Sequence, residues 1–220
     1  MCRLLETIRV RTYRAEHLAW HFRRIAASTG SDSAARAITG AAVQIVREQT
    51  GLAIAGPSRY RLRIEYIGDT VCEYSIVPYR PGALNALCVR GPVEYKLKYA
   101  DRRALDATAA GLAVGVEPLY VSDGRVLETR YANLAFRRKG VWFTPAEVMH
   151  EGTTRARLLA SGAVRLSDIR LSDLSRFDRI CLLNAMLDPG EVGIHPSRVF
   201  SLPSGSGVAL EVLDISQSDQ

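Results

Sequence analysis

Several features are missing from this 220-residue sequence, and each absence disfavours a class of protein. No apolar run approaches the roughly 18 to 20 residues that a membrane-spanning helix needs. The first ten residues, MCRLLETIRV, also lack the long apolar core of a secretion signal. The four cysteines, Cys2, Cys72, Cys88 and Cys181, are widely separated and form no CxxC pair, which disfavours a disulfide framework or a zinc site. We therefore expect a cytoplasmic protein with reduced thiols.

Common catalytic and nucleotide-binding motifs are missing as well. No GxSxG nucleophile motif occurs, and SGSG at residues 204–207 neither follows a predicted strand nor opens a helix, as a phosphate loop would. His17 and His21 lie four apart on a predicted helix, but no third ligand is evident and EHLAWH is not the HExxH order. The sequence therefore predicts no metal site and gives no support for a serine or cysteine nucleophile.

The charge pattern favours a small anionic ligand over nucleic acid. The formal net charge is +6, but the arginines are spread along the chain and no basic run with interleaved aromatic residues occurs. Scattered arginine suits a small anion, because guanidinium pairs bidentately with phosphate and carboxylate. Hydrophobic residues make up 47% of the chain, which is enough to form the core of one large domain or two small ones.

Residues 1–80 predict a small α+β domain. The patterns are apolar and β-branched runs for strands, helical spacing of apolar residues, and polar caps. The predicted elements are, in order, a strand over 4–13, a helix over 15–29, a helix capped by Asp32 or Ser33 and ending near Gly51, and strands over 59–67 and 70–79 joined by a turn at Gly68 and Asp69.

A larger domain is expected over residues 85–200, after a connection at 81–84 that is rich in turn-forming residues. Turns at Asp123-Gly124 and Lys139-Gly140 join short apolar runs, which favours antiparallel hairpins over a doubly wound parallel sheet. The other predicted elements are a strand over 86–91, a helix over 102–113, a helix over 153–162 and a strand over 178–186. The tail, residues 201–220, begins Ser/Gly-rich and ends polar, so we expect it to be poorly ordered.

Seven short segments, in order, carry a resemblance to a known family: ETIRV, HFRR, KYADR, DGRVLETRYAN, WFTP, EGTTR and LLNAM. The chain resembles, over roughly residues 5–185, the class IV aminotransferases. These fold-type IV pyridoxal-phosphate enzymes include branched-chain and D-amino acid aminotransferases and aminodeoxychorismate lyase. The resemblance implies a two-domain α+β fold like that of D-amino acid aminotransferase, pyridoxal 5'-phosphate (PLP) as cofactor, and a homodimer.

The resemblance identifies Lys98 as the catalytic lysine. The family's lysine lies four residues ahead of an arginine in the pattern K-x-x-[DN]-R, which Lys98 and Arg102 match, whereas Lys96 is followed at that distance by Ala100. A strand would place both lysines on one face, so alternation alone does not separate them. The implied chemistry is a Schiff base with the cofactor aldehyde and proton transfer at the adjacent carbon. That role requires a neutral amine, hence a lowered pKa.

The same resemblance implies the other cofactor contacts. Glu128 matches the acidic residue that faces the pyridine nitrogen and keeps it protonated. Arg24 matches the family's phosphate arginine in the pattern H-x-x-R, with the adjacent Arg23 as the alternative.

The rest of the phosphate site is expected at two turns. Thr153 and Thr154, after Gly152, match the family's phosphate-binding turn at a helix start, where backbone N–H groups meet the anion. At the last element, Ala185 stands where relatives often carry threonine or serine, so it offers only its backbone N–H.

Substrate contacts are expected from Thr7, Arg9 and Tyr95, because these segments border the pocket in the family. Arg130 departs from the family pattern, which commonly has a small polar residue there. We expect Arg130 either to crowd the cofactor or to bind a substrate carboxylate.

The motifs do not decide the reaction. The short chain, the asparagine-led LLNAM and the surplus arginine favour a lyase that acts on aminodeoxychorismate, a dicarboxylate, and forms p-aminobenzoate for folate biosynthesis. The alternative is a transaminase of D- or branched-chain amino acids. A third hypothesis is a non-catalytic PLP-binding or interaction protein, suggested by Arg130 and by a shorter N-terminus than the family usually has.

Overall fold

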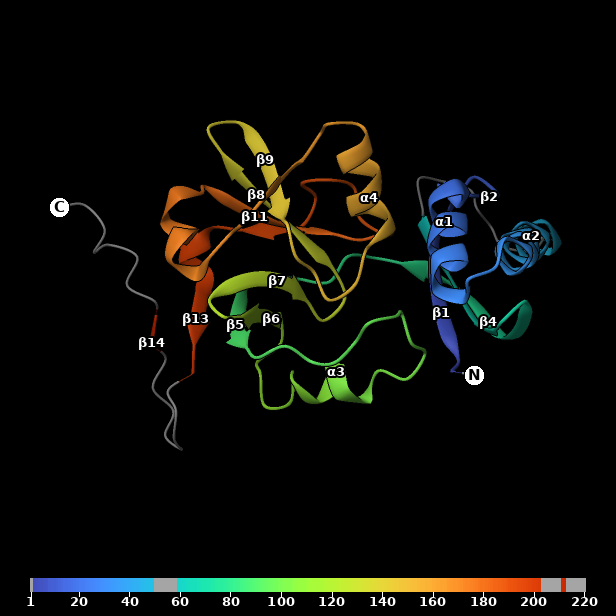
Figure 1. Ribbon diagram of the computed structural model, residues 1–220, viewed down its shortest axis with the longest axis horizontal. Helices are drawn as coiled ribbons and strands as arrows, with labels where there is room; N and C mark the ends of the chain where they lie inside the picture. The colour runs from blue at the N-terminus through green and yellow to red at the C-terminus, as the bar shows by residue number, and fades with distance from the viewer. Residues whose placement is uncertain (1, 50–58, 203–210, 213–220) are drawn as a thin grey trace. The chain divides into compact units, whose positions relative to one another are not determined.

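The computed structural model describes residues 2–49, 59–202 and 211–212, and contacts within the chain divide it into two units (Figure 1). Unit 1 comprises Met1–Pro81 and Tyr95–Asp101, and unit 2 comprises Gly82–Glu94 and Arg102–Gln220. The chain therefore enters unit 2, returns to unit 1 for seven residues, and leaves again. The linear division expected from the sequence assigns residues 95–101 to the larger domain, whereas their contacts group them with unit 1.

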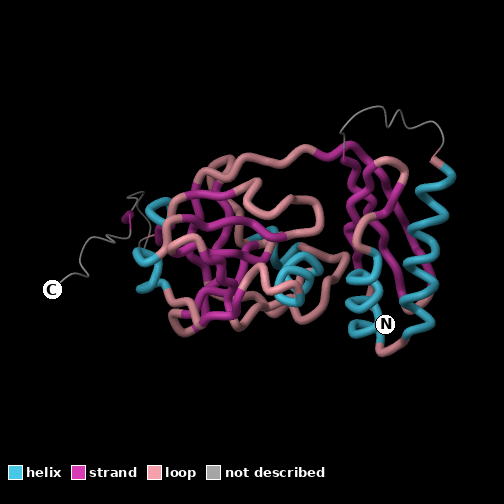
Figure 2. The backbone as a smooth tube through the Cα atoms, turned by 90° about the horizontal axis from the view of Figure 1, so that it is seen from above, coloured by secondary structure: helices cyan, strands magenta, loops and turns pink. Residues whose placement is uncertain are grey.

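Unit 1 is a four-stranded antiparallel sheet in the order β2-β1-β3-β4 with two helices on one side of it (Figure 2). Its elements are β1 (Leu4–Arg11), β2 (Arg14–Ala15), α1 (Leu18–Thr29), α2 (Asp32–Glu48), β3 (Arg59–Ile67) and β4 (Thr70–Tyr79). The strands expected over 59–67 and 70–79 are confirmed at both ends. None of the described helices, in either unit, is long and apolar enough to cross a membrane.

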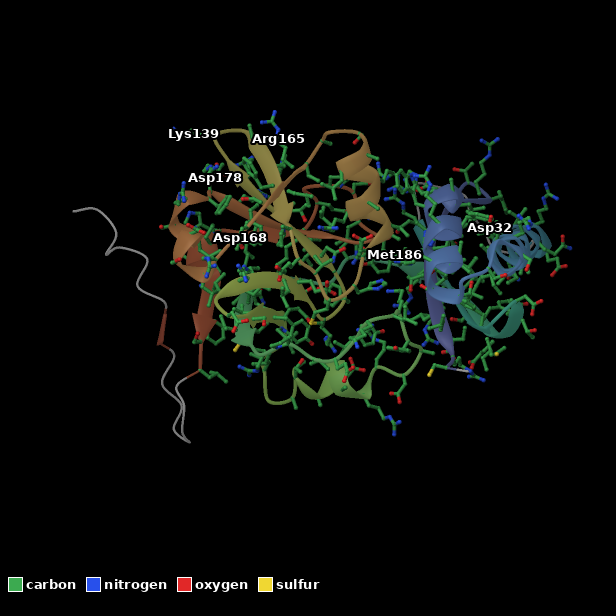
Figure 3. All side chains as sticks on the ribbon, viewed as in Figure 1. Asp32, Lys139, Arg165, Asp168, Asp178 and Met186 are labelled. Carbon is green, nitrogen blue, oxygen red and sulfur yellow. The ribbon has the colours of Figure 1, made fainter. Side chains whose placement is uncertain are left out.

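The start of α2 differs from the expectation. The cap is Ser31, which has an extended backbone and a hydroxyl that accepts the Ala34 N–H at 3.2 Å. Asp32, labelled in Figure 3, is already the first helical residue, where its charge is favourable at the helix N-terminus. Three adjacent polar residues can each form an N-cap, so the pattern alone does not select one. The expected end near Gly51 lies outside the described residues.

The core of unit 1 follows strand alternation. Ile8 and Val10 of β1 and Leu62 and Ile64 of β3 are buried beneath the helices, as alternation predicts for one face of a sheet. Glu6 belongs to the same inward-facing series and is 0% exposed. A carboxylate therefore lies in the apolar layer, and it needs charged partners there.

Unit 2 contains two five-stranded sheets, in the orders β10-β9-β8-β11-β12 and β14-β13-β5-β6-β7. The strands are β5 (Ala86–Arg90), β6 (Val116–Ser122), β7 (Arg125–Thr129), β8 (Asn133–Arg138), β9 (Val141–Pro145), β10 (Arg165–Ser167), β11 (Arg179–Leu183), β12 (Gly193–Ile194), β13 (Val199–Ser201) and β14 (Glu211–Val212). The helices are α3 (Arg103–Ala107) and α4 (Thr153–Ala160), with 3-10 turns η1 (Leu171–Arg176) and η2 (Pro196–Arg198).

The two expected hairpins are present. Asp123 and Gly124 turn β6 into β7, Lys139 and Gly140 turn β8 into β9, and all four residues have positive φ, as such two-residue turns require. The pairs β5–β6, β5–β13 and β9–β10 are parallel, so unit 2 mixes both kinds of pairing. The α+β fold class is confirmed.

One expectation for unit 2 differs from the structure, and another concerns the tail, which the structure describes only in part. The helix expected over 102–113 is only α3, followed by turns in which Gly111 has φ 76°. In the tail, residues 203–210 and 213–220 lie outside the described residues, and β14 pairs with β13.

Glycine substitutions in the two units are expected to have opposite effects on stability. A Cβ at Gly193 in β12 would lie 2.4 Å from the Ile180 carbonyl oxygen of β11. Gly193→Ala should lower the free energy of unfolding by about 1 to 3 kcal/mol, because a packed strand must move. Gly40→Ala is the control: Gly40 is exposed in α2 with nothing within 4 Å of its Cβ, so alanine should raise stability by roughly 0.5 to 1 kcal/mol. Urea denaturation measures both, and an unchanged Gly193→Ala midpoint would contradict the close approach.

Candidate functional site

Lys98 is the central residue of a tight turn that is bound to the edge of β1. The Tyr99 N–H donates to the Leu97 carbonyl at 2.9 Å, which closes a three-residue turn around Lys98. The Lys98 carbonyl accepts the Leu5 N–H at 2.8 Å, and the Ala100 N–H donates to the Arg3 carbonyl at 3.0 Å. Hydrogen bonds on both sides of Lys98 therefore fix the backbone that carries its amine.

The structure distinguishes Lys98 from Lys96 by burial. Leu97 and Tyr99 pack against the apolar core of unit 1, while Lys96 is exposed and Lys98 is half-buried. The segment is a turn with one isolated bridge rather than a strand, so the alternation that would place both lysines on one face does not apply. The half-buried position suits an amine that acts on a bound molecule.

Tyr95 supports this turn. Its side chain is buried, its hydroxyl donates to the Tyr99 carbonyl at 2.8 Å, and the two rings meet edge to face with centroids 5.4 Å apart. The sequence predicts that Tyr95 contacts the substrate. The structure shows Tyr95 holding the segment that carries Lys98, and the substrate contact stays a prediction.

Glu6, His21 and Arg24 form a buried charged cluster between β1 and α1. His21 Nδ1 lies 2.5 Å from Glu6 Oε2, and Arg24 Nε donates to Glu6 Oε1 at 2.9 Å. Arg24 Nη2 also donates to Glu6 Oε2, so the guanidinium binds the carboxylate through two nitrogens. His21 and Arg24 lie three apart on α1 and therefore face the same strand.

The pKa shifts in this cluster follow from burial and charge. Burial opposes ionisation of Glu6, but the charges of Arg24 and His21 outweigh it and hold the pKa of this carboxyl well below its usual range. Burial lowers the pKa of His21, which Glu6 opposes, while the positive charges of Arg24 and Lys98 lower it further. Glu6 is therefore ionised at neutral pH, and the electrostatics of Lys98 and this cluster are linked.

Arg24 and Arg23 have different environments. Arg24 is oriented by Glu6 and its side chain is 11% exposed. Arg23 is exposed, and its guanidinium carbon lies 4.5 Å from the centroid of the Trp20 ring. The inward-facing arginine is the one that matches the family pattern.

Thr7 and Arg9 lie on the other face of β1 from Glu6, because alternate residues of a strand face opposite sides of the sheet. Arg9 is buried and its Nε donates to Glu16 Oε2 at 2.5 Å. Sequence reasoning missed two carboxylates: Glu6, which orients Arg24, and Glu16, which orients Arg9. The signal for Glu6 is its place in the inward-facing series of β1.

Glu128 lies in β7 of unit 2 and is 6% exposed. Its Oε2 accepts the Asn133 Nδ2 at 3.1 Å and the His150 backbone N–H at 3.0 Å. Hydrogen bonds donated to a carboxylate favour its ionised form. The residue predicted to face the ring nitrogen is thus a buried, oriented carboxylate, and sequence reasoning missed the role of Asn133.

Two segments predicted to bind phosphate lie together in unit 2. Helix α4 begins after Gly152 with buried Thr153 and Thr154, and the Thr154 hydroxyl donates to the Asn184 carbonyl at 2.9 Å. Asn184 Oδ1 in turn accepts the Met186 N–H at 2.9 Å, so Ala185 lies in a turn fixed against the helix start. Met186, labelled in Figure 3, lies on the side of unit 2 away from Lys139.

Arg130 is engaged by carboxylates of unit 2. Its Nε and Nη2 donate to Glu117 at 3.2 and 3.0 Å, and its Nη1 donates to Asp106 at 3.0 Å. The hydrogen bonds and charges of Glu117 and Asp106 raise the pKa of Arg130 despite its partial burial. Arg102, the arginine of the lysine motif, donates to the Arg130 carbonyl at 2.9 Å. Binding of a substrate carboxylate by Arg130 stays a prediction, and such a carboxylate would have to compete with these two.

Comparisons with known proteins identify a family for this chain. The family model described as "Amino-transferase class IV" matches residues 97–192. A relative in Haemophilus influenzae, an uncharacterized protein, is 32% identical over 130 residues, which cover 57% of this chain and 68% of the relative.

Solved structures share the fold. A crystal structure from Haemophilus somnus, named a candidate 4-amino-4-deoxychorismate lyase, has a TM-score of 0.70 and 25% identity over 84% of this chain and 97% of that one. A hypothetical aminotransferase from Mycobacterium tuberculosis in its PLP-bound form has a TM-score of 0.64 and 19% identity over 90% and 81% of the two chains. The matched family model spans the Lys98, Glu128, Thr153 and Ala185 segments described above. This chain belongs to the class IV aminotransferase family of PLP-dependent enzymes.

Proposed function

We propose that this protein is a lyase that releases pyruvate from 4-amino-4-deoxychorismate and forms p-aminobenzoate. The observation that carries the proposal is the likeness to the Haemophilus somnus structure, which extends over 97% of that chain at 25% identity. The asparagine-led segment LLNAM, which resembles the form seen in lyase-like members, supports the same choice. We further propose a cytoplasmic homodimer that serves folate biosynthesis.

The residues present fit PLP. In unit 1, Arg24 supplies a guanidinium of the kind that binds phosphate. In unit 2, the first N–H groups of α4 have no partner within the helix, which suits an anion such as phosphate. Glu128 is a buried carboxylate that suits a protonated ring nitrogen, and Lys98 supplies an amine. When bound, PLP supplies an aldehyde that condenses with amines and a ring that accepts electrons.

In this proposal, Lys98 is the group that moves the proton. Its amine takes the proton from the ring carbon that bears the substrate amine. The electron pair of that C–H bond forms a double bond in the substrate ring as the neighbouring C–O bond breaks, and the enolate of pyruvate leaves. The enolate takes up the proton that the Lys98 ammonium returns and becomes pyruvate. The ring becomes aromatic, which supplies much of the driving force. Thr7, Arg9 and Tyr95 are the proposed residues for orienting the substrate, with arginine suited to its carboxylates.

Replacing the two lysines separately tests the assignment of Lys98. Lys98→Ala should reduce the turnover number by roughly 10²- to 10⁴-fold or more, because the proton-transfer group is lost. It should also abolish the visible absorbance band of enzyme-bound PLP. Lys96→Ala is the matched control, two residues away and exposed, and should leave both the band and the activity close to wild type. Loss of the band in Lys96→Ala alone would identify Lys96 as the lysine that binds the cofactor.

Arg24 and Arg23 offer a second matched pair of substitutions. Arg24→Ala should weaken PLP binding about 10- to 100-fold, since hydrogen bonds to a charged group are lost. Arg23→Ala should leave the dissociation constant unchanged, because Arg23 is exposed and lies over Trp20. Equilibrium titration of the apoprotein with PLP measures both values. The reverse order of effects would contradict the assignment of the phosphate arginine.

The reaction is tested by the substrate that the purified holoenzyme turns over. With aminodeoxychorismate and no amino acceptor, we expect pyruvate and p-aminobenzoate in equal amounts. Amino acids should not convert the bound cofactor to its pyridoxamine form. Conversion with a D- or branched-chain amino acid, without pyruvate release from aminodeoxychorismate, would identify a transaminase instead. Absence of both reactions in a protein that binds PLP would indicate a non-catalytic member.

A further inference from the structure

We propose that Asn133 is a positioning residue for two cofactor-binding groups of unit 2. These groups are Glu128, for the ring of the cofactor, and the start of α4, for its phosphate. The proposal rests on the proposed binding of PLP by Glu128 and the start of α4. Asn133 is the first residue of β8 and is 3% exposed. Its side chain therefore has to satisfy its hydrogen bonds within the protein.

The amide of Asn133 binds three groups from two segments. Its Nδ2 donates to Glu128 Oε2 at 3.1 Å and to the His150 carbonyl at 2.9 Å, and its Oδ1 accepts the Gly152 N–H at 2.9 Å. The His150 N–H also donates to Glu128 Oε2 at 3.0 Å. Asn133 and the His150 peptide thus hold the same carboxylate oxygen, while Asn133 also fixes the loop before α4.

This arrangement needs glycine at position 152, because the Asn133 side chain lies too close to leave room for a Cβ. A Cβ at Gly152 would lie 2.3 Å from Asn133 Oδ1, a distance that side chains do not adopt. The φ of Gly152 is −78°, which any residue can adopt, so its conformation gives no reason for glycine. Gly152 is also the residue from which α4 starts, so the position of the first turn of α4 is set by Asn133.

A buried arginine near Glu128, Arg155, supports the positioning role of Asn133. Arg155, in the first turn of α4, is buried and donates to the Pro145 carbonyl at 2.8 Å. Burial lowers the pKa of Arg155, and the charges of Glu151 and Glu128 oppose that shift. Glu128 therefore interacts electrostatically with the helix that Asn133 positions. One amide side chain links the partner of the ring nitrogen to the phosphate-binding turn.

Separate probes for the two ends test the proposal. Pyridoxal, which lacks the phosphate, reports on the ring end, and inorganic phosphate reports on the start of α4. Asn133→Ala should weaken the binding of both probes by about tenfold each, because hydrogen bonds at both ends are lost. Glu128→Gln should weaken pyridoxal and leave phosphate unchanged. Gly152→Ala, which displaces the Asn133 oxygen, should weaken phosphate more than pyridoxal.

The apoprotein provides a readout that is independent of the cofactor. Amide hydrogen exchange at Gly152 and His150 should accelerate in Asn133→Ala. Asn85→Ala is the matched control, because Asn85 also lies beside a glycine, Gly115, where a Cβ would be 2.4 Å from Asn85 Nδ2. That variant should change neither the exchange at Gly152 and His150 nor the binding of either probe.

Three results would overturn the proposal or separate it from the proposed function. If Asn133→Ala weakens pyridoxal alone, or neither probe, Asn133 does not couple the two ends. If Asn133→Ala fails to fold, Gly152→Ala decides, and unchanged phosphate binding in that variant refutes the role. If wild-type protein binds neither pyridoxal nor PLP, the assignment of the cofactor site fails. In that case the coupling proposal falls with it, while hydrogen exchange still reports whether Asn133 fixes the loop.

Discussion

A buried carboxylate must be surrounded by charges or hydrogen-bond donors, and this constraint organises the candidate site residues in each unit. Glu6 lies in the apolar layer of unit 1 and is bound by His21 and Arg24. Glu128 lies in unit 2 and is bound by Asn133 and the His150 N–H. Leaving either carboxylate without its partners would cost several kcal/mol, so each carboxylate strongly constrains the positions of its partners. Each unit thereby holds oriented polar groups on rigid elements.

Rigid support also explains why Lys98 lies in a turn rather than a strand. A regular strand would fix the residue on one face of a sheet, whereas here backbone hydrogen bonds on both sides of Lys98 hold a three-residue turn against β1. The conformational cost of the turn is offset by its hydrogen bonds to β1 and by the hydrogen bond that the Tyr95 hydroxyl donates to the Tyr99 carbonyl. A side chain that acts on a bound molecule needs such support, since small displacements reduce rates strongly.

Local patterns predict the longer strands and most helices, because apolar alternation and helical spacing are short-range signals. They do not predict the short strands β2, β10, β12, β13 and β14. The resemblance to the family, carried by its motifs, selects Lys98 and Glu128. Contacts between distant segments are not predictable in this way. The return of residues 95–101 to unit 1 depends on hydrogen bonds to residues more than ninety positions away, which no local pattern records. For the same reason the role of Asn133, within the motif LETRYAN, emerges only when the Gly152 loop lies against it. A motif shows which residues occur together, and only packing shows which of them orients another.

Arg130 shows how a departure from the family pattern is accommodated. An arginine two residues after Glu128 would introduce an uncompensated charge beside a carboxylate assigned to the cofactor. Instead Arg130 is paired with Glu117 through two nitrogens and with Asp106 through the third. Because these carboxylates neutralise the guanidinium within unit 2, Glu128 keeps Asn133 as its partner. Arg130 therefore gives no reason to expect an inactive protein, and the main sequence argument for a non-catalytic member is weakened.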